Sequence, residues 1–258
     1  MLIKTPVGST GELNDFFTVH GAWCGAWAWD CLTPTLDELG ISYKTIDLPG
    51  HGQNKRSMWS VSLADYANAV VDTANSINGP VIAVGHSMGG IVVSEAAAKA
   101  PSAFQALTYL AAFLPISGER LAFLAAKDKA SKLNGGIKTH LLRGSSTLKE
   151  HCLDDALFNQ CSAEDARMGK SLLGENPIRP ILSSVNLNDQ FDAIPKHYIR
   201  CMADQAITPS HQEWMANRYT LKSFQDIDSG HMAAHSAPKK VAEALVKIRS
   251  LESNIDKT

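Results

Sequence analysis

The sequence has few of the features that mark membrane, secreted or nucleic-acid-binding proteins. No apolar run approaches the roughly 18–20 residues that a membrane-spanning helix requires, and residues 1–8 lack the apolar segment of a secretory signal. The 24 Lys and Arg residues nearly balance the 26 Asp and Glu residues, for a net charge of −2, and they form no basic run. We therefore expect a cytoplasmic protein with no nucleic-acid partner and no membrane partner.

Cysteine is also scarce. The five cysteines are odd in number, and no two of them form a Cys-x-x-Cys pair. This pattern argues against a disulfide framework or a zinc knuckle and is typical of a reducing compartment. We predict no metal site, and we expect the cysteines to behave as small buried hydrophobic side chains. They are Cys24, Cys31, Cys152, Cys161 and Cys201.

What the sequence does contain is an alternation of short apolar strands and amphipathic helices. Apolar residues make up 45% of the chain, enough for a sizeable core. The alternation predicts an α/β fold with a mostly parallel, doubly wound sheet. Residues 1–15 are polar and rich in turns, with room for one edge strand. The predicted strands then cover residues 16–19, 41–48, 80–84 and 104–110, and the predicted helices 29–39, 62–77 and 90–98.

The alternation stops over residues 115–195, where no strand is evident. Helices are predicted there at 119–132, 146–159 and 163–173, with a proline-interrupted stretch near residues 176–180. Sheet-like segments resume at 197–202 and 223–227, and a last helix begins near Pro238. We therefore predict a core of residues 1–114 and 196–258, with residues 115–195 as a helical cap.

The stretch Gly85-His86-Ser87-Met88-Gly89 lies between a predicted buried strand and an Ala-rich helix. Strand, sharp turn and helix with a serine at the turn is the setting of a nucleophile elbow. Flanking glycines remove the Cβ atoms that would clash in such a turn. The helix N-terminus favours developing negative charge. Ser87 is thus the predicted nucleophile, and His86 is expected to point away from it.

A serine nucleophile needs a base and a carboxylate that orients the base. In a parallel sheet such groups lie at the carboxyl ends of strands. His231 follows the last predicted strand and is the predicted base, with His235 as its rival. Asp204 follows the preceding strand and is the predicted acid. Asp226 and Asp228 are closer to the histidine in sequence but belong to the strand or its end.

The oxyanion that forms on attack needs two hydrogen-bond donors. One predicted donor is the backbone N–H of Met88, at the start of the helix after the nucleophile. The other is the backbone N–H of Ala22, in the loop His20-Gly21-Ala22-Trp23 that follows the first predicted strand. Gly21 allows a close approach of the backbone in this loop.

These residues resemble the α/β-hydrolase superfamily over essentially the whole chain. More narrowly, the chain is similar to the branch that joins plant methylesterases and hydroxynitrile lyases to bacterial esterases of similar size. The motifs that carry the resemblance are His20-Gly21-Ala22-Trp23-x-x-x-Trp27, Asp47-Leu48-Pro49-Gly50-His51-Gly52, Gly85-His86-Ser87-Met88-Gly89-Gly90, Tyr109-Leu110-Ala111-Ala112-Phe113-Leu114-Pro115, Asp204-Gln205-Ala206-Ile207 and Gly230-His231-Met232.

The resemblance implies an α/β-hydrolase fold with a helical cap after the sixth strand. It places Ser87, Asp204 and His231 in the catalytic triad and Ala22 and Met88 in the oxyanion hole, with no cofactor. Two positions depart from the hydroxynitrile lyases. Those enzymes carry threonine or asparagine where this chain has Gly21, and many carry lysine where it has Met232. Both departures favour an esterase.

We therefore expect a serine carboxylesterase that hydrolyses an apolar or aromatic ester, a small-molecule substrate, through an acyl-enzyme. The alternatives are a hydroxynitrile lyase or other cofactor-free lyase on the same triad, and a receptor-like ligand-binding module with vestigial hydrolysis. The sequence also allows a homodimer. The residues expected to contact substrate are Gly21, Trp23, Trp27, Phe113, Phe123, Phe158 and Met232.

Overall fold

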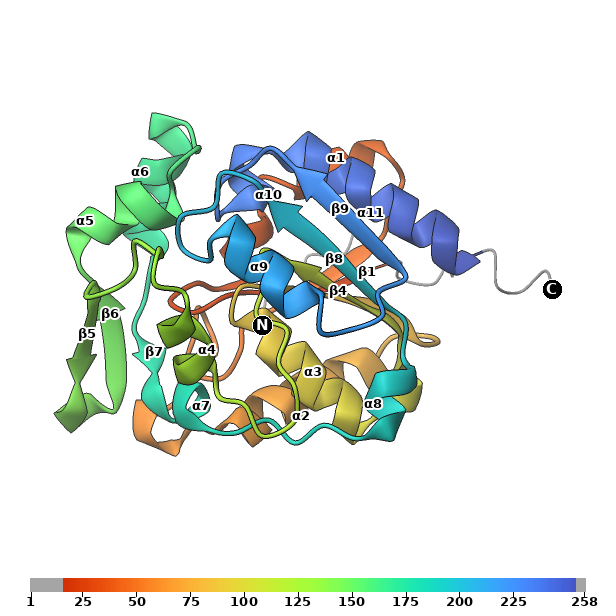
Figure 1. Cartoon of the computed structure of the whole chain (residues 1–258), viewed down its shortest axis with the longest axis horizontal. Coiled ribbons are helices and arrows are strands. Elements are labelled where there is room, and N and C mark those ends of the chain that lie inside the picture. The colour runs from red at the N-terminus through yellow and green to blue at the C-terminus, as the bar shows by residue number, and fades with distance from the viewer. Residues whose placement is uncertain (1–15, 254–258) are drawn as a thin grey trace.

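A six-stranded parallel sheet forms the centre of the protein. The computed structural model describes residues 16–253, so the edge strand expected within residues 1–15 lies outside the described residues. The strands lie side by side in the order β2-β1-β3-β4-β8-β9 (Figure 1). Their bounds are β1 Phe16–Val19, β2 Tyr43–Ile46, β3 Val81–His86, β4 Phe104–Leu110, β8 Lys196–Cys201 and β9 Ser223–Ile227. The predicted α/β fold with a mostly parallel sheet is confirmed.

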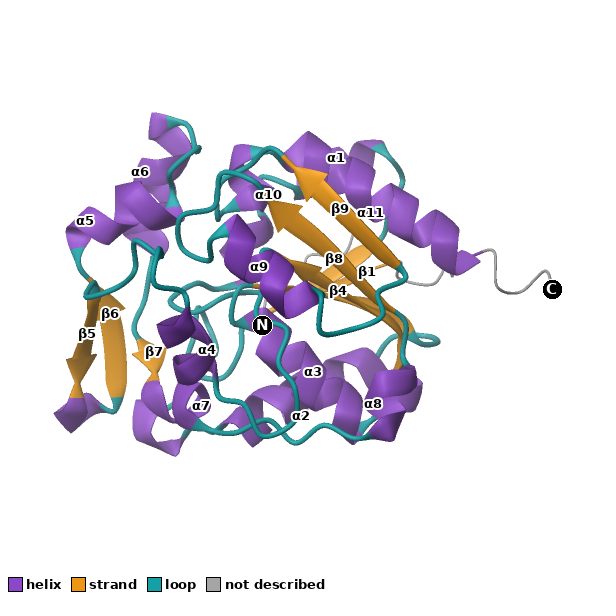
Figure 2. Cartoon of the chain, in the orientation of Figure 1, coloured by secondary structure: helices purple, strands orange, loops and turns teal. Residues whose placement is uncertain are grey.

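Helices cover both faces of this sheet (Figure 2). On one face lie α2, Leu63–Asn75, and α3, Gly89–Lys99; on the other lie α1, Thr33–Glu38, and α11, Pro238–Ser253. Helix α9, Pro209–Ala216, connects β8 to β9, and the short helix α10, Ala233–Ser236, precedes α11. The helix predicted over residues 62–77 is present as α2, and it begins with a capping box, in which the side chains of Ser62 and Asp65 each accept from the other's backbone N–H.

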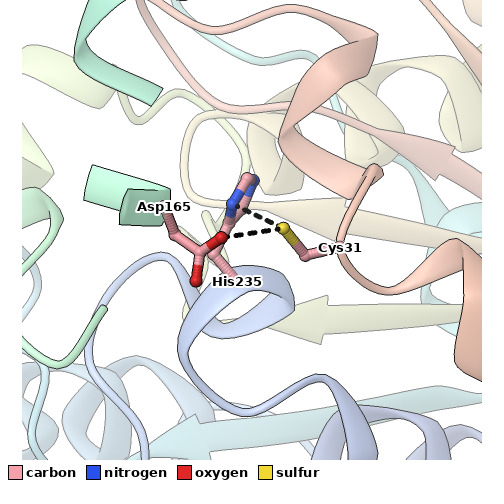
Figure 3. Close-up of side chains that lie close together, drawn as sticks. All are labelled: Cys31, Asp165 and His235. Atoms are coloured by element: carbon pink, nitrogen blue, oxygen red, sulfur yellow. Dashed lines mark hydrogen bonds between the residues drawn. The ribbon is translucent and has the colours of Figure 1, made fainter. Parts of the chain in front are cut away.

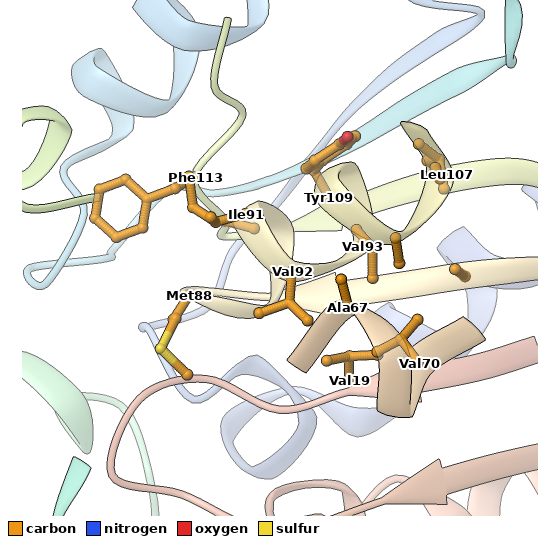
Figure 4. Close-up of a cluster of buried hydrophobic side chains, with 14 of the residues drawn as sticks. Val19, Ala67, Val70, Met88, Ile91, Val92, Val93, Leu107, Tyr109 and Phe113 are labelled. Atoms are coloured by element: carbon orange, nitrogen blue, oxygen red, sulfur yellow. The ribbon is translucent and has the colours of Figure 1, made fainter. Parts of the chain in front are cut away.

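Two apolar layers fill the space between the sheet and its helices. Strand β3 is buried along its whole length, as expected for a central parallel strand with helices on both faces. In the layer under α2 and α3, Val70 and Val92 pack with Val19 and Leu107 of the sheet (Figure 4). The other layer joins α1 and α11 to the opposite face. This packing holds the carboxyl ends of β3, β8 and β9 rigidly.

Between β4 and β8 the chain forms an inserted group of elements. Its helices are α4 Leu121–Lys127, α5 Glu150–Cys152, α6 Ala163–Leu172, α7 Ile178–Leu182 and α8 Asp189–Ala193, with a π-helical turn over Leu153–Leu157. Its strands are β5 Ile137–His140, β6 Ser145–Leu148 and β7 Asn176–Pro177, which form an antiparallel sheet. Most of these elements lie on the side toward which β8 and β9 point, while the last helix of the group, α8, lies against α3 near the start of β8 (Figure 1).

The expectation of a wholly helical cap was therefore wrong. Residues 146–148, predicted to begin a helix over 146–159, instead belong to β6, which pairs with β5 across a short hairpin loop. Gly144 closes that loop with a φ of 65°, a conformation that glycine adopts without steric cost. The insertion also follows the fourth described strand rather than a sixth, since β1 to β4 are the described strands before it.

The helix predicted over residues 29–39 is shorter than expected. A 3-10 turn over Ala26–Trp29 precedes it, and α1 begins only at Thr33, where Pro34 occupies the first turn. Among the described residues, no helix combines the length and apolar character needed to cross a membrane.

Candidate active site

Ser87 lies on the sharp turn between β3 and α3, in a strained backbone conformation. Its φ is 55°, a left-handed value that costs a non-glycine residue about 1–3 kcal/mol. The surrounding backbone holds it there. The Ser87 N–H donates to the carbonyl of Leu110 (3.4 Å), and the Ser87 carbonyl accepts from the N–H groups of Gly90 and Phe113 (3.1 Å each). The strain is thus balanced by contacts to the next strand and helix.

Two glycines allow this turn to close. A Cβ atom on Gly85 would lie 2.6 Å from the carbonyl oxygen of Gly89, and one on Gly89 would lie 2.4 Å from the carbonyl oxygen of Val19. Both distances are shorter than any carbon–oxygen contact that a packed protein accepts. The glycines of the motif are therefore required by close backbone approach on either side of Ser87.

His231 and Asp204 meet beside this turn. The His231 Nδ1–H donates to Asp204 Oδ2 at 2.8 Å, and both side chains are buried. Asp204 is fixed by further bonds: its Oδ1 accepts from the N–H groups of Ala206 (2.7 Å) and Ile207 (3.0 Å), and its Oδ2 from Gln212 Nε2 (2.9 Å). A carboxylate held by this many donors keeps one orientation, and its bond to Nδ1–H holds the imidazole in one tautomer, with Nε2 left to take a proton.

The rival acids are engaged elsewhere. Asp226 forms a two-pronged pair with Arg200 (2.7 and 2.8 Å), and Asp228, 82% exposed, pairs with Lys240 (3.0 Å). Both carboxylates lie on the surface, where an ion pair fixes its side chains only weakly.

The rival base His235 is also turned to another partner. Its Nδ1 lies 3.2 Å from Cys31 Sγ. It does not line the cavity described next.

Ser87 and His231 line one small cavity. Its volume is about 10 Å³, room for about one water molecule. The predicted residues Gly21, Ala22, Trp23 and Met232 line it as well. Within the described residues, neither the N–H of Ala22 nor that of Met88 donates a hydrogen bond. Two unpaired backbone donors near a serine are what an oxyanion hole requires.

His20 holds the loop that carries Ala22. The His20 Nδ1–H donates to the carbonyl of Gly21 (2.8 Å), and its Nε2 accepts from the N–H of Leu48 (3.0 Å). The ring must be neutral to make both bonds. Burial, together with the nearby His51 charge, lowers the pKa of His20 to about 3, which keeps it neutral.

Trp23 connects the same loop to the cap. Its φ is 62°, and the cap holds this strained residue with three bonds. The Trp23 N–H donates to Asn176 Oδ1 (3.3 Å), its indole N–H donates to Ser146 Oγ (3.3 Å), and its carbonyl accepts from the N–H of Gly174 (2.8 Å). The cap therefore sets the shape of this loop.

Three further residues line the cavity that were not expected to contact substrate: Cys24, His86 and Leu157. His86 was expected to point away from Ser87, and it lines the same cavity as Ser87. Its Nε2–H donates to the carbonyl of His231 (2.9 Å), and the two rings lie 4.8 Å apart between centroids. His86 thus supports the backbone at His231. Leu157 comes from the cap, and no local sequence pattern indicates which cap side chain reaches the cavity.

Four residues expected to contact substrate do not line this cavity: Trp27, Phe113, Phe123 and Phe158. Trp27 packs edge-on against His235. Phe113 and Phe158 are buried in the two core layers. Phe123 is 60% exposed on α4, where the guanidinium of Arg120 stacks on it. Apolar residues in a sequence are more often core than ligand contacts, and aromatic type alone did not separate the two.

Comparison with known proteins places this geometry in a family. A chloroplastic protein of Arabidopsis thaliana assigned as methylesterase 11 is 30% identical over 255 residues, covering 92% of this chain and 64% of its own length. An alpha-hydroxynitrile lyase of Arabidopsis thaliana is 28% identical, covering 91% of this chain and 96% of its own. The crystal structure of an Arabidopsis methylesterase superposes with a TM-score of 0.78 at 25% identity, covering 92% of this chain and 98% of its own. Residues 16–244 match the model of the alpha/beta hydrolase family, and the chain belongs to that family.

Proposed function

We propose that this protein is a serine carboxylesterase that hydrolyses an apolar or aromatic carboxylic ester through an acyl-enzyme on Ser87. The family and the methylesterase relatives support a carboxylic ester hydrolase. The observation that carries the finer proposal is the position of His231. Its Nδ1 bonds the buried Asp204 at 2.8 Å, while the same residue lines one cavity with Ser87.

In the proposed reaction, Ser87 Oγ attacks the ester carbonyl carbon as His231 Nε2 takes the hydroxyl proton. The carbonyl π electrons move to the oxygen, which the N–H groups of Ala22 and Met88 stabilise. Collapse of this intermediate breaks the ester C–O bond, and the imidazolium gives its proton to the departing alcohol. Water, deprotonated by His231, then attacks the acyl-enzyme and releases the acid, which restores the Ser87 hydroxyl. Asp204 stabilises the imidazolium in both halves.

The preference for an apolar ester rests on the walls of the cavity. Trp23, Leu157 and Met232 supply apolar surface, and no Lys, Arg, Asp or Glu of residues 16–253 lines it. A larger cavity of about 330 Å³ lies against the cap and shares Trp23 as a wall. Leu148, Leu153 and Leu173 supply its apolar lining, and Thr147, Lys170 and Glu175 line it as well. That volume is in the range of small-molecule sites. An ester bound at Ser87 would extend toward it past Trp23.

Gly21 argues against cyanohydrin cleavage. A Cβ atom there would lie 2.9 Å from Ser87 Cβ and 3.2 Å from His86 Nδ1. A threonine or asparagine at this position would therefore require the nucleophile to move. Met232 is buried and uncharged, so it provides no cation for a leaving cyanide.

The test compares the wild type with Ser87→Ala on p-nitrophenyl esters graded in acyl length and aromaticity. The wild type should release p-nitrophenol with a preference for apolar acyl groups, and Ser87→Ala should lose several orders of magnitude in kcat while keeping its melting temperature. A fluorophosphonate should label wild-type Ser87 stoichiometrically, as read by mass spectrometry.

Three outcomes would refute the proposal. Hydrolysis by Ser87→Ala at the wild-type rate would show that Ser87 is not the nucleophile. Rapid cyanide release from mandelonitrile, with negligible turnover of every ester, would favour the lyase. Tight ligand binding that Ser87→Ala leaves unchanged, again without ester turnover, would favour a receptor.

A further inference from the structure

Cys31, Asp165 and His235 bring three potential metal ligands together away from the site described above (Figure 3). Cys31 Sγ lies 3.2 Å from His235 Nδ1 and 3.6 Å from Asp165 Oδ1. All three donor atoms lie within 4.8 Å of one another. A thiol, an imidazole and a carboxylate are the three side-chain types that bind zinc in proteins.

The three residues come from three different parts of the fold. Cys31 lies in the core between the 3-10 turn and α1, Asp165 in the first turn of the cap helix α6, and His235 on α10. His235 is four residues beyond His231, and Asp165 is eight residues beyond Leu157 in sequence. A ligand bound by all three would join the cap to the core beside the candidate active site.

The spacing of the donor atoms fits a tetrahedral ion. With Zn–S near 2.3 Å and Zn–N and Zn–O near 2.1 Å, tetrahedral geometry puts sulfur about 3.6 Å from nitrogen or oxygen. The observed separations from Cys31 Sγ are 3.2 Å to the nitrogen and 3.6 Å to the oxygen. The nitrogen and the oxygen lie within 4.8 Å of each other. Tetrahedral geometry needs about 3.4 Å between them, so binding would draw the His235 and Asp165 side chains toward that separation.

The surroundings of the cluster hold two of its ligands in place. Ser162 Oγ donates to Asp165 Oδ2 at 2.6 Å, which leaves Oδ1 directed at Cys31. His235 is buried and packs against the Trp27 ring, and its Nδ1 is the nitrogen that faces Cys31. The bond from Ser162 fixes the Asp165 carboxylate, and outer hydrogen bonds of this kind raise the metal affinity of a ligand. Cys31 and Asp165 are partly exposed, which provides a path for an ion and a water.

We propose that Cys31, Asp165 and His235 form a zinc-binding site that joins the cap to the core, with water as the fourth ligand. Binding forms Zn–S, Zn–O and Zn–N bonds, and the Cys31 thiol proton is released to solvent. The thiolate favours Zn²⁺ over Mg²⁺ or Ca²⁺, which prefer oxygen ligands alone. The cysteine spacing offers no sign of this site, because its ligands are distant in sequence.

The experiment uses the full chain, stripped with chelator and titrated with Co²⁺ as a spectroscopic probe and then with Zn²⁺. We expect one Co²⁺ per chain with a thiolate-to-cobalt charge-transfer band in the near ultraviolet, which Zn²⁺ abolishes by displacement. Zn²⁺ at about 100 times its Kd should raise the melting temperature by about 5–11 °C. Mg²⁺ should do neither.

Three variants decide the assignment. Cys31→Ser should lose the band, and Asp165→Asn should weaken Co²⁺ binding at least about 10-fold. Cys161→Ser is the matched control, a partly buried cysteine outside the cluster, and should bind as the wild type does. Circular dichroism in chelator checks that each variant is folded.

Absence of stoichiometric Co²⁺ binding by the wild type would overturn the proposal. Binding by Cys31→Ser equal to that of the wild type, or its loss in Cys161→Ser, would do the same. Ser87→Ala should bind Co²⁺ as the wild type does. The test of the zinc site is therefore independent of whether the esterase proposal holds.

Discussion

Replacing Gly21 with alanine adds one carbon atom at the tightest point of the candidate active site. The new Cβ would lie 2.9 Å from Ser87 Cβ and 3.2 Å from His86 Nδ1. Neither neighbour can easily retreat. Ser87 is strained at φ 55° and held by backbone bonds to Leu110, Gly90 and Phe113, while the His86 ring bonds the backbone of the base.

The size of the effect follows from this contact. Ordinary van der Waals contact begins at 3.4 Å, so Ser87 Cβ must move by about 0.5 Å from 2.9 Å. Misplacing a reacting group by about 1 Å costs on the order of 100-fold in rate, so a shift of half that size should cost at least about 10-fold. Overpacking of a rigid site costs a further ~1–3 kcal/mol of folding stability. We expect kcat to fall about 10- to 100-fold.

The assay is steady-state hydrolysis of p-nitrophenyl acetate, with the free energy of unfolding measured in urea. Gly174→Ala is the matched control, because the nearest atom to its Cβ, outside neighbouring residues, is the Trp23 carbonyl oxygen at 4.0 Å. It should keep wild-type turnover. If Gly21→Ala retained more than half the wild-type kcat, the close approach of this loop to Ser87 would not be what shapes the site.

Three further predictions test other parts of the structure. Asp204→Asn should lower kcat about 10⁴-fold in single-turnover assays without unfolding the protein, because the amide cannot hold the His231 tautomer; wild-type turnover would contradict its role. The folding free energy should fall by up to about 5 kcal/mol as pH drops from about 6.5 to 3, since burial lowers the pKa of His20 to about 3 and the unfolded chain takes up that proton first. Urea titrations of His20→Gln should show a free energy of unfolding that depends less on pH than that of the wild type. A pH dependence equal to that of the wild type would refute this. Glu252→Ala should lose about 1–3 kcal/mol in the same assay, because it leaves the buried His197 Nε2–H without its 2.8 Å acceptor and Lys222 without its carboxylate partner, and a loss below about 1 kcal/mol would show these contacts to be unimportant.

Local patterns were sufficient for the core of the fold. The apolar runs at residues 16–19 and 104–110 coincide with β1 and β4, because a parallel strand with helices on both faces must be apolar along its length. Turn residues mark where such strands end. Ser87, Asp204 and His231 each follow a strand of one parallel sheet, and parallel strands end at the same edge. The juxtaposition of Asp204 with His231 follows from that rule.

The insertion was less predictable. Residues 145–148 pair with residues 137–140 in a hairpin whose serine-rich strand carries little apolar periodicity. Their strand conformation depends on partners in the cap, where Ser146 also bonds the indole of Trp23. Propensity over so short a segment is weak, and tertiary contacts override it.

The sequence by itself determined the parallel sheet, the turn at Ser87 and the positions of Ser87, Asp204 and His231 after strands of that sheet, because each of these features is marked by a local pattern in the chain. Only the tertiary structure decided which side chains surround them. Leu157 reaches the cavity, and Cys31 lies 134 residues from Asp165 and 204 from His235 in sequence. Such contacts depend on how the cap packs on the core, and side-chain packing between distant segments leaves no periodic pattern in the chain.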